Sequence, residues 1–195
     1  MKTSNYKLDP WKIIEQGWDP HKILGSESIF SIGNGSMGQR ANFEEDFSGK
    51  TLQGSYIAGI YYPDKTKVGW WKNGYPEYFA KVINAPNWIG ISIKINDSPL
   101  DLYKVEKIER FERILDMKKG LYQRLISFKM KNDLRIEINS KRFLSMRRES
   151  IGAISYSLKC NRDIKIDISP FIDFDVSNND SNWDEKFWDI IERTN

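Results

Sequence analysis

Apolar and polar residues alternate along most of the chain. The isoleucines at positions 89, 91, 93 and 95 are separated by Gly90, Ser92 and Lys94, and this period of two predicts a half-buried strand. The same period recurs in the runs 126–130, 134–138, 154–158 and 164–168. The polar residues 131–133 predict a short hairpin loop between two of these runs, and Pro170 ends the last one. The pattern indicates antiparallel sheets with one buried face and one wet face.

Helical periodicity is scarce. Trp11, Ile14, Glu15 and Trp18 have the spacing of one short helical turn, and residues 28–32 have the composition of a strand. The charged stretch 104–117 fits either a helix or a strand with a loop. We therefore predict one all-β domain over residues 1–195, a two-sheet antiparallel β-sandwich.

Segment 61–79 breaks the alternation. It combines seven aromatic rings with two prolines and two glycines, which predicts a long loop or an excursion from the sheet. So many rings cannot all reach the core, and large apolar patches usually mark a partner or a ligand. Trp70, Trp71 and Tyr75 are thus candidates for binding carbohydrate or for an interface, with packing inside this chain as the alternative. The 13% aromatic content of the whole chain also fits a wide β-sheet core.

The charge and the single cysteine narrow the class of protein. The 30 basic and 27 acidic residues are mixed along the chain, which is not the clustered charge of a nucleic-acid-binding protein. Cys160 excludes an intrachain disulfide and favours a reducing compartment. The first residues lack the apolar stretch of a signal peptide, and no apolar run approaches the ~20 residues of a membrane span. These features predict a cytoplasmic protein that binds neither membrane nor nucleic acid.

Residues 33–38 read GNGSMG and match the G-x-G-x-x-G pattern of dinucleotide sites. That site needs a helix after the glycines, and residues 39–43 have no apolar helical face. A tight turn that uses the positive φ of glycine is the better interpretation.

Other candidate sites are weak. His21 is the only histidine, which excludes a multi-histidine zinc site, and we expect it at the surface. Segment 173–184 begins like a calcium loop but has Asn178 and Asp184 where the pattern requires glycine and glutamate, so a polar connection is favoured. The doublets 141–142 and 147–148 are interpreted as solvated strand ends. No catalytic centre, metal site or cofactor site is predicted.

Several stretches together resemble glycoside hydrolase family 65, the inverting phosphorylases of maltose, trehalose and kojibiose. They follow the family's order over nearly the whole chain and are residues 27–45, 56–61, 86–88, 113–120 and 142–146. Segments 69–79 and 180–188 look most like those of maltose phosphorylases.

The resemblance implies a large, commonly dimeric enzyme. It would have an N-terminal super-sandwich of the galactose mutarotase-like kind, a helical linker, an (α/α)6 barrel and a C-terminal sheet. The general acid and the phosphate-binding residues lie in the barrel, so no catalytic residue carries over and this chain alone is expected to be inactive. Its implied partners are its own barrel domain, a second subunit, and maltose with inorganic phosphate, without a cofactor.

The resemblance also implies that the sandwich continues beyond residue 195, and the apolar group within residues 183–191 has no closing turn after it. We therefore expect an incomplete domain. The alternatives are a stand-alone carbohydrate-binding module and a small mutarotase-like enzyme, and the single histidine disfavours the second.

Overall fold

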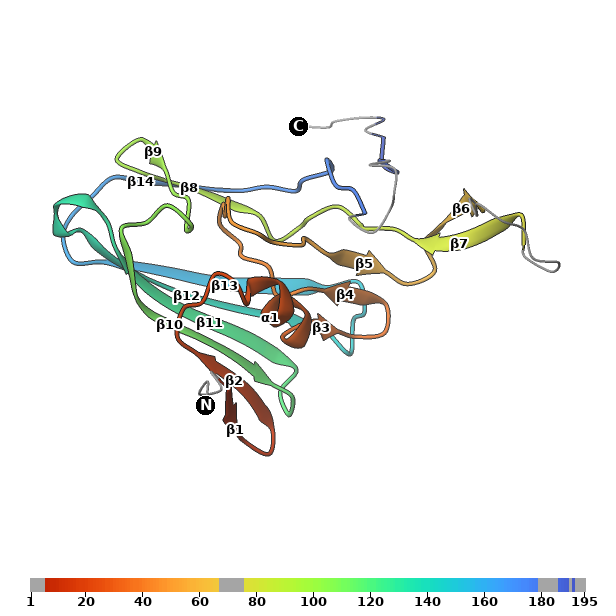
Figure 1. Ribbon diagram of the computed structural model, residues 1–195, viewed down its shortest axis with the longest axis horizontal. Coiled ribbons are helices and arrows are strands. Elements are labelled where there is room, and N and C mark those ends of the chain that lie inside the picture. The colour runs from red at the N-terminus through yellow and green to blue at the C-terminus, as the bar shows by residue number, and fades with distance from the viewer. Residues whose placement is uncertain (1–5, 67–75, 179–185, 190, 192–195) are drawn as a thin grey trace.

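The computed structural model describes residues 6–66, 76–178, 186–189 and 191 (Figure 1). Its main body is two facing antiparallel sheets. The large sheet has the order β1-β2-β10-β11-β12-β13, with strands β1 (Tyr6–Leu8), β2 (Lys12–Gln16), β10 (Lys107–Asp116), β11 (Leu121–Lys129), β12 (Arg135–Leu144) and β13 (Gly152–Cys160). The small sheet has the order β14-β8-β9, with strands β14 (Ile166–Pro170), β8 (Ile91–Ile95) and β9 (Ser98–Pro99).

Two smaller sheets extend the molecule at one end (Figure 1). One contains β3 (Ile32–Gly33), β4 (Met37–Gln39) and β5 (Ser55–Ile57). The other is the hairpin of β6 (Tyr61–Lys65) and β7 (Tyr78–Val82), which projects away from the body. A helix, α1 (Ile23–Ile29), precedes β3, and a 3₁₀ turn, η1 (Lys131–Asp133), joins β11 to β12.

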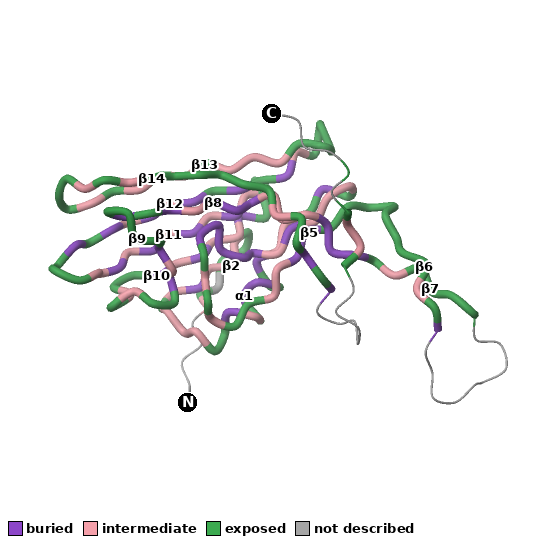
Figure 2. The backbone as a smooth tube through the Cα atoms, turned by 90° about the horizontal axis from the view of Figure 1, so that it is seen from above, coloured by how far each residue is buried: buried purple, intermediate pink, exposed green. Residues whose placement is uncertain are grey.

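The core lies between the large and small sheets, as the buried colouring in Figure 2 shows. Ile93 of β8 is 1% exposed and belongs to one apolar cluster with Ile126 and Ile138, both 0% exposed. These residues are the apolar members of the alternating runs. The predicted all-β class and antiparallel sandwich are therefore confirmed, because alternate residues of each strand bury one face.

Three local predictions were wrong or left open. The helical spacing at 11–18 belongs to strand β2, which pairs with β10 and buries Glu15. The expected strand at 28–32 contains the end of α1, and only Ile32 of it enters β3. The ambiguous stretch 104–117 forms the ten-residue strand β10, which has a bulge between Ile108 and Arg110.

Segment 61–79 leaves the body as predicted, but its described flanks are paired strands instead of loop. Within the described residues, no helix is long and apolar enough to cross a membrane.

Candidate functional site

The glycine-rich motif forms the turn between β3 and β4. Gly35 has φ +92°, a conformation that glycine adopts without strain. The Asn34 side-chain oxygen accepts the amides of Ser36 at 3.1 Å and Met37 at 2.7 Å, while its nitrogen donates to the carbonyls of Ser145 and Glu149 at 2.9 Å each. Asn34 thus fixes the turn and attaches it to the loop after β12. The helix precedes the glycines instead of following them, which confirms the turn interpretation.

Glu27 and Arg40, which lie on either side of this turn, also make internal contacts. Glu27 is fully buried and accepts hydrogen bonds from the Thr51 hydroxyl and from the Leu52 amide, the second at 2.9 Å. Arg40 donates to the carbonyls of Leu52 at 2.9 Å and Leu24 at 3.1 Å. These contacts hold α1 and segment 51–54 together.

A row of polar side chains crosses the buried face of the large sheet. Strand register places the following residues side by side from β2 to β13: Glu15, Arg113, Arg124, Ser140 and Tyr156. Each of them shares a face with its neighbour because directly opposite residues of antiparallel strands point the same way. Arg113, Arg124 and Ser140 have no solvent exposure.

Glu44 and Glu45, on the segment between the two sheets, are the counter-ions of this row. Glu44 accepts Arg124 at 2.6 Å and the Ser140 hydroxyl at 2.6 Å, and it lies 3.4 Å from Arg142. Glu45 accepts Arg124 at 2.7 Å and also the hydroxyl of Tyr156. We call Glu15, Glu44, Glu45, Arg113, Arg124 and Arg142 the ionic network.

Aromatic rings complete the surroundings of the guanidinium groups. The Arg113 guanidinium lies 5.0 Å from the Phe43 ring centroid and 3.4 Å from Glu15. The Arg142 guanidinium lies 4.7 Å from the Tyr122 ring. Such ring contacts stabilise a desolvated cation. Three arginines face three glutamates, so the network is neutral and does not present the excess positive charge that would attract an anion.

The arginines around Glu44 favour its ionised form. Burial by itself would raise the pKa of Glu44, but Arg142 and Arg124 and the hydrogen bond from Ser140 outweigh it and lower that pKa. Burial and the Glu45 carboxylate both raise the pKa of Tyr156, which therefore stays protonated and can donate. A neutral set of charges whose acids and arginines pair with one another supports structure and does not suit proton transfer.

The ionic network was missed by the sequence interpretation. Residues 141–142 were predicted to be a solvated strand end, yet Arg142 is 1% exposed, because it is the inward member of the alternation in β12. Position in the alternating pattern was the available signal: Arg113, Arg124 and Arg142 all occupy inward positions.

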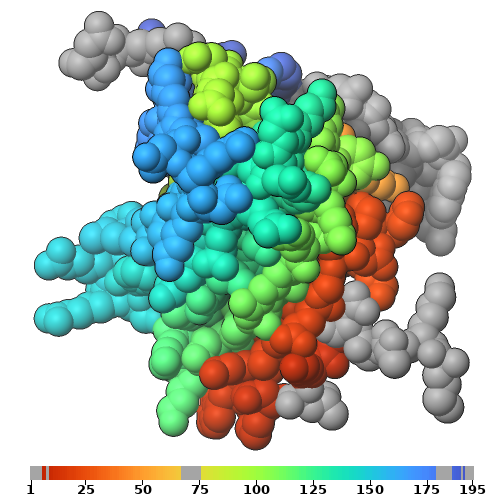
Figure 3. Space-filling view, turned by 90° about the vertical axis from the view of Figure 1, so that its left-hand side faces the viewer, coloured from red at the N-terminus to blue at the C-terminus, as the bar shows by residue number. Residues whose placement is uncertain are grey.

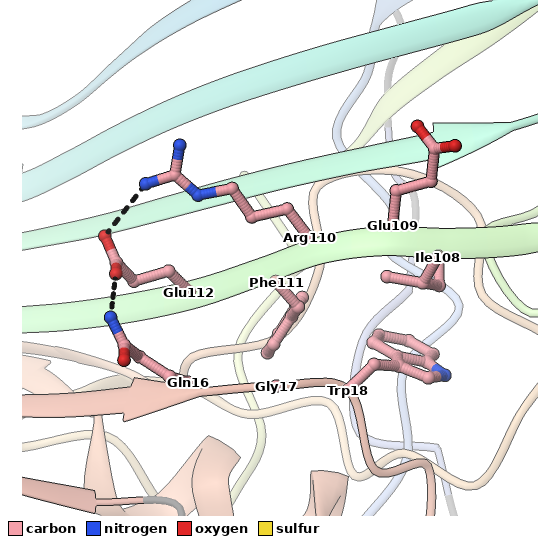
Figure 4. Close-up of a pocket in the computed structure, with 8 residues that line it drawn as sticks. All are labelled: Gln16, Gly17, Trp18, Ile108, Glu109, Arg110, Phe111 and Glu112. Atoms are coloured by element: carbon pink, nitrogen blue, oxygen red, sulfur yellow. Dashed lines mark hydrogen bonds and ion pairs between the residues drawn. The ribbon is translucent and has the colours of Figure 1, made fainter.

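A surface cleft of about 330 Å³ opens where β2 separates from β10 (Figure 4). Gln16 donates to Glu112 at 2.5 Å, and Arg110 lies 3.9 Å from the same carboxylate. Trp18 contributes to the wall, but its ring also packs edge-on against Phe111, with centroids 5.1 Å apart. The cleft has polar groups for binding but no nucleophile paired with a base.

The remaining predicted sites are placed as follows. Trp70, Trp71 and Tyr75 lie outside the described residues. His21 is exposed, as expected. Within the described part of the chain, no cluster of three or more His, Cys, Asp or Glu side chains could hold a metal ion.

Comparison with known proteins identifies the family to which the chain belongs. The model of the N-terminal domain of glycosyl hydrolase family 65 matches residues 13–195. The chain therefore belongs to that family, and it corresponds to the family's N-terminal domain.

Similarity to individual proteins supports the same family assignment. The chain is 45% identical over 184 residues to maltose phosphorylase of Bacillus subtilis, covering 94% of this chain and 24% of the relative. It is 32% identical over 189 residues to α,α-trehalose phosphorylase of Thermoanaerobacter brockii, covering 92% and 24%. A solved structure assigned as a kojibiose phosphorylase from the human microbiome shares the fold, with a TM-score of 0.80 and 35% identity, over 90% of this chain and 23% of that one. The chain thus spans about a quarter of the length of these relatives.

Proposed function

We propose that this chain is the N-terminal, non-catalytic domain of a maltose phosphorylase-like enzyme. The 45% identity to the Bacillus subtilis protein is the observation that carries this proposal. The complete enzyme would cleave maltose with phosphate to give glucose and β-glucose 1-phosphate. A phosphate oxygen attacks the anomeric carbon from the face opposite the glycosidic oxygen, and this attack inverts the anomeric centre. The glycosidic C–O bond breaks, and a carboxylic acid protonates the departing oxygen.

The role of this domain is to bind the catalytic barrel of the same enzyme through its surface. Tyr56, Ile57, Tyr61 and Val82 surround a shallow hollow beside the glycine-rich turn and are 37–55% exposed; we call them the hairpin face. Contiguous exposed apolar side chains mark a surface that another protein covers. We propose that the catalytic barrel packs on the hairpin face, and that Trp70, Trp71 and Tyr75 extend the same contact to the barrel or to a second subunit. The single cysteine supports a cytoplasmic location.

The test of activity uses a chimaera in which the rest of Bacillus subtilis maltose phosphorylase follows residue 195. We expect the chimaera to release glucose 1-phosphate from maltose and phosphate, and the 195-residue chain to release none. Turnover by the purified short chain, in proportion to its concentration, would refute the proposal. Maltose binding by the short chain alone would favour the carbohydrate-binding module instead.

The test of the docking surface compares two substitutions in the chimaera. Val82→Asp puts a charge in the centre of the hairpin face, and we expect at least a tenfold loss of activity together with a separate, earlier unfolding transition. Trp11→Ser, at a side chain in the β1–β2 turn that is 57% exposed against 49% for Val82, should change neither the activity nor the unfolding transition. Equal behaviour of the two variants would show that the hairpin face is not the interface.

For the aromatic segment, an unchanged oligomeric state and Michaelis constant in Trp70→Ala/Trp71→Ala would exclude its part of the proposal.

A further inference from the structure

The glycine-rich turn contains a chemically labile pair of residues. Asn34 is followed directly by Gly35, and Asn73–Gly74 is the only other Asn–Gly pair in the sequence. Asparagine is one of the thermolabile residues of proteins, because the next backbone nitrogen can attack its side-chain carbonyl carbon. A following glycine leaves that nitrogen open to the attack, since glycine has no Cβ and adopts many backbone conformations. The sequence therefore indicates that Asn34 can lose its amide group by deamidation.

Deamidation at Asn34 takes two steps and needs no reagent except water. The Gly35 nitrogen gives up its proton and bonds to Cγ of Asn34, the Cγ–Nδ2 bond breaks, and Nδ2 takes up a proton and leaves as ammonia. Water then opens the five-membered succinimide ring at either of its two carbonyl carbons. The products are aspartate and isoaspartate, and no atom is oxidised or reduced. Each product carries a negative charge that the amide of Asn34 lacks.

The folded turn holds the Asn34 side chain against this reaction. Asn34 is 6% exposed, and both ends of its amide have partners. Oδ1 accepts the amides of Ser36 and Met37, and Nδ2 donates to the carbonyls of Ser145 and Glu149, at distances of 2.7–3.1 Å. Attack at Cγ makes that planar carbon tetrahedral and moves both Oδ1 and Nδ2. The ring therefore cannot close while all four hydrogen bonds are in place, and the turn must open first.

The products cannot restore the attachment between the turn and the loop after β12. That attachment uses Nδ2 of Asn34 as the donor to Ser145 and Glu149. A carboxylate has no hydrogen to donate, so aspartate would set a charged oxygen against two carbonyl oxygens. The Glu149 carboxylate, which accepts the Ser36 hydroxyl at 2.5 Å, adds repulsion between like charges. Isoaspartate also lengthens the backbone of the turn by one carbon atom.

We propose that Asn34 is a latent deamidation site: opening of the glycine-rich turn controls the reaction, and the reaction irreversibly releases the loop after β12. The rate follows the small population in which the four hydrogen bonds are broken, because opening and closing are fast compared with the chemistry. Residues 35–38 also line the hollow of the hairpin face, so the released turn loosens the surface proposed to bind the barrel. That last consequence rests on the proposed function, whereas the modification itself does not.

The first experiment measures how fast Asn34 is converted. The 195-residue chain is incubated at neutral pH in buffer and in concentrated urea, with circular dichroism to verify the folded and unfolded states. Peptide mass mapping and isoaspartate detection follow the conversion. Asn73, which lies outside the described residues, is the internal standard for the unfolded chain because it also precedes a glycine.

We expect Asn34 and Asn73 to convert at similar rates in urea. In the folded chain Asn34 should convert at least about 30-fold more slowly than in urea, which corresponds to about 2 kcal/mol for opening the turn. Equal rates for Asn34 in the folded and unfolded chain would overturn the proposal. So would an Asn34 that stays intact in urea while Asn73 is converted.

The second experiment introduces the aspartate product directly. Asn34→Asp is compared with Asn132→Asp, which makes the same chemical change at an exposed residue of the β11–β12 turn. This turn lies at the other end of β12 from Ser145, and it belongs to the teal segment that faces the viewer in Figure 3. The measurement is amide hydrogen exchange of the folded chains.

An aspartate at position 34 can still accept the amides of Ser36 and Met37, so exchange at those two amides should stay slow. The amides of Ser145 and Ile151, which donate within the loop after β12 at 2.9 Å each, should exchange at least about tenfold faster in Asn34→Asp. The control variant should leave these rates unchanged. Unchanged exchange at both loop amides in Asn34→Asp would show that deamidation does not release the loop. An inactive chimaera would contradict the proposed function and would leave both results as they are.

Discussion

The Glu44→Ala substitution tests whether the ionic network holds the sandwich together. It removes the carboxylate that accepts Arg124 and Ser140 at 2.6 Å and lies 3.4 Å from Arg142. Arg124 keeps Glu45, but Arg142 has no second acid among the described residues and keeps the carbonyl of Asn42 at 3.1 Å and the face of the Tyr122 ring. Removing one partner of a buried ion pair costs about 3–5 kcal/mol, because an uncompensated charge stays buried. For a chain of this size that lowers the melting temperature by about 6–20 °C.

The assay is urea and thermal unfolding of both proteins by circular dichroism. Glu106→Ala is the control, because Glu106 pairs with Lys129 at the surface at 3.5 Å and should contribute within about 0.5 kcal/mol. If Glu44→Ala costs less than about 1 kcal/mol, the network does not hold the sandwich as described.

The same pair of proteins gives a pH dependence. The folded pKa of Glu44 lies below its unfolded value, so its stabilisation is complete above the unfolded pKa and is lost as the pH falls through the folded one. The stability difference between the two proteins should therefore be largest at neutral pH and shrink below about pH 4. A difference that stays constant into acid would refute the electrostatic explanation.

Two further substitutions follow from local geometry. Asn34→Ala removes the two hydrogen bonds to the loop after β12 and the two within the turn. It should lower the free energy of unfolding in urea by about 2–3 kcal/mol. A change below about 0.5 kcal/mol would show that the turn holds without these hydrogen bonds. Gly120→Ala should cost about 1 kcal/mol because Gly120 has φ +60°. Its matched partner Gly25→Ala, in α1 with open space around the new Cβ, should be neutral or stabilising by up to about 1 kcal/mol, and the opposite order of the two would contradict the backbone assignment.

The long alternating strands were predictable, and the polar interior was not. β8, β11, β12 and β13 follow from period-two patterns because each buries one face. β2 was missed because the apolar residues Trp11, Ile14 and Trp18 imitate a helical face, and its strand form depends on pairing with β10 one hundred residues away. Such long-range pairing overrides local periodicity.

The candidate site was harder to predict because charges are normally assigned to the surface. Arg124 and Glu44 are 80 residues apart in the sequence, and neither by itself indicates burial. The alternation in β11 indicates that Arg124 points inward, but only the folded structure shows that it meets Glu44. The resemblance located residues 27–45 as a signature but did not reveal that Glu27, Asn34 and Glu44 serve the architecture.

The ionic network also favours the native register of the strands over alternative registers. If β11 slipped by two residues against β12, the same face would still point inward, but Tyr122 or Ile126 would replace Arg124 beside Glu44 and Glu45. Two carboxylates would then be left in the interior without their shared cation, a penalty of several kcal/mol that an apolar row does not impose. The polar row across the sheet thus distinguishes the native alignment from its nearest competitors, which a uniform stripe of isoleucines could not do.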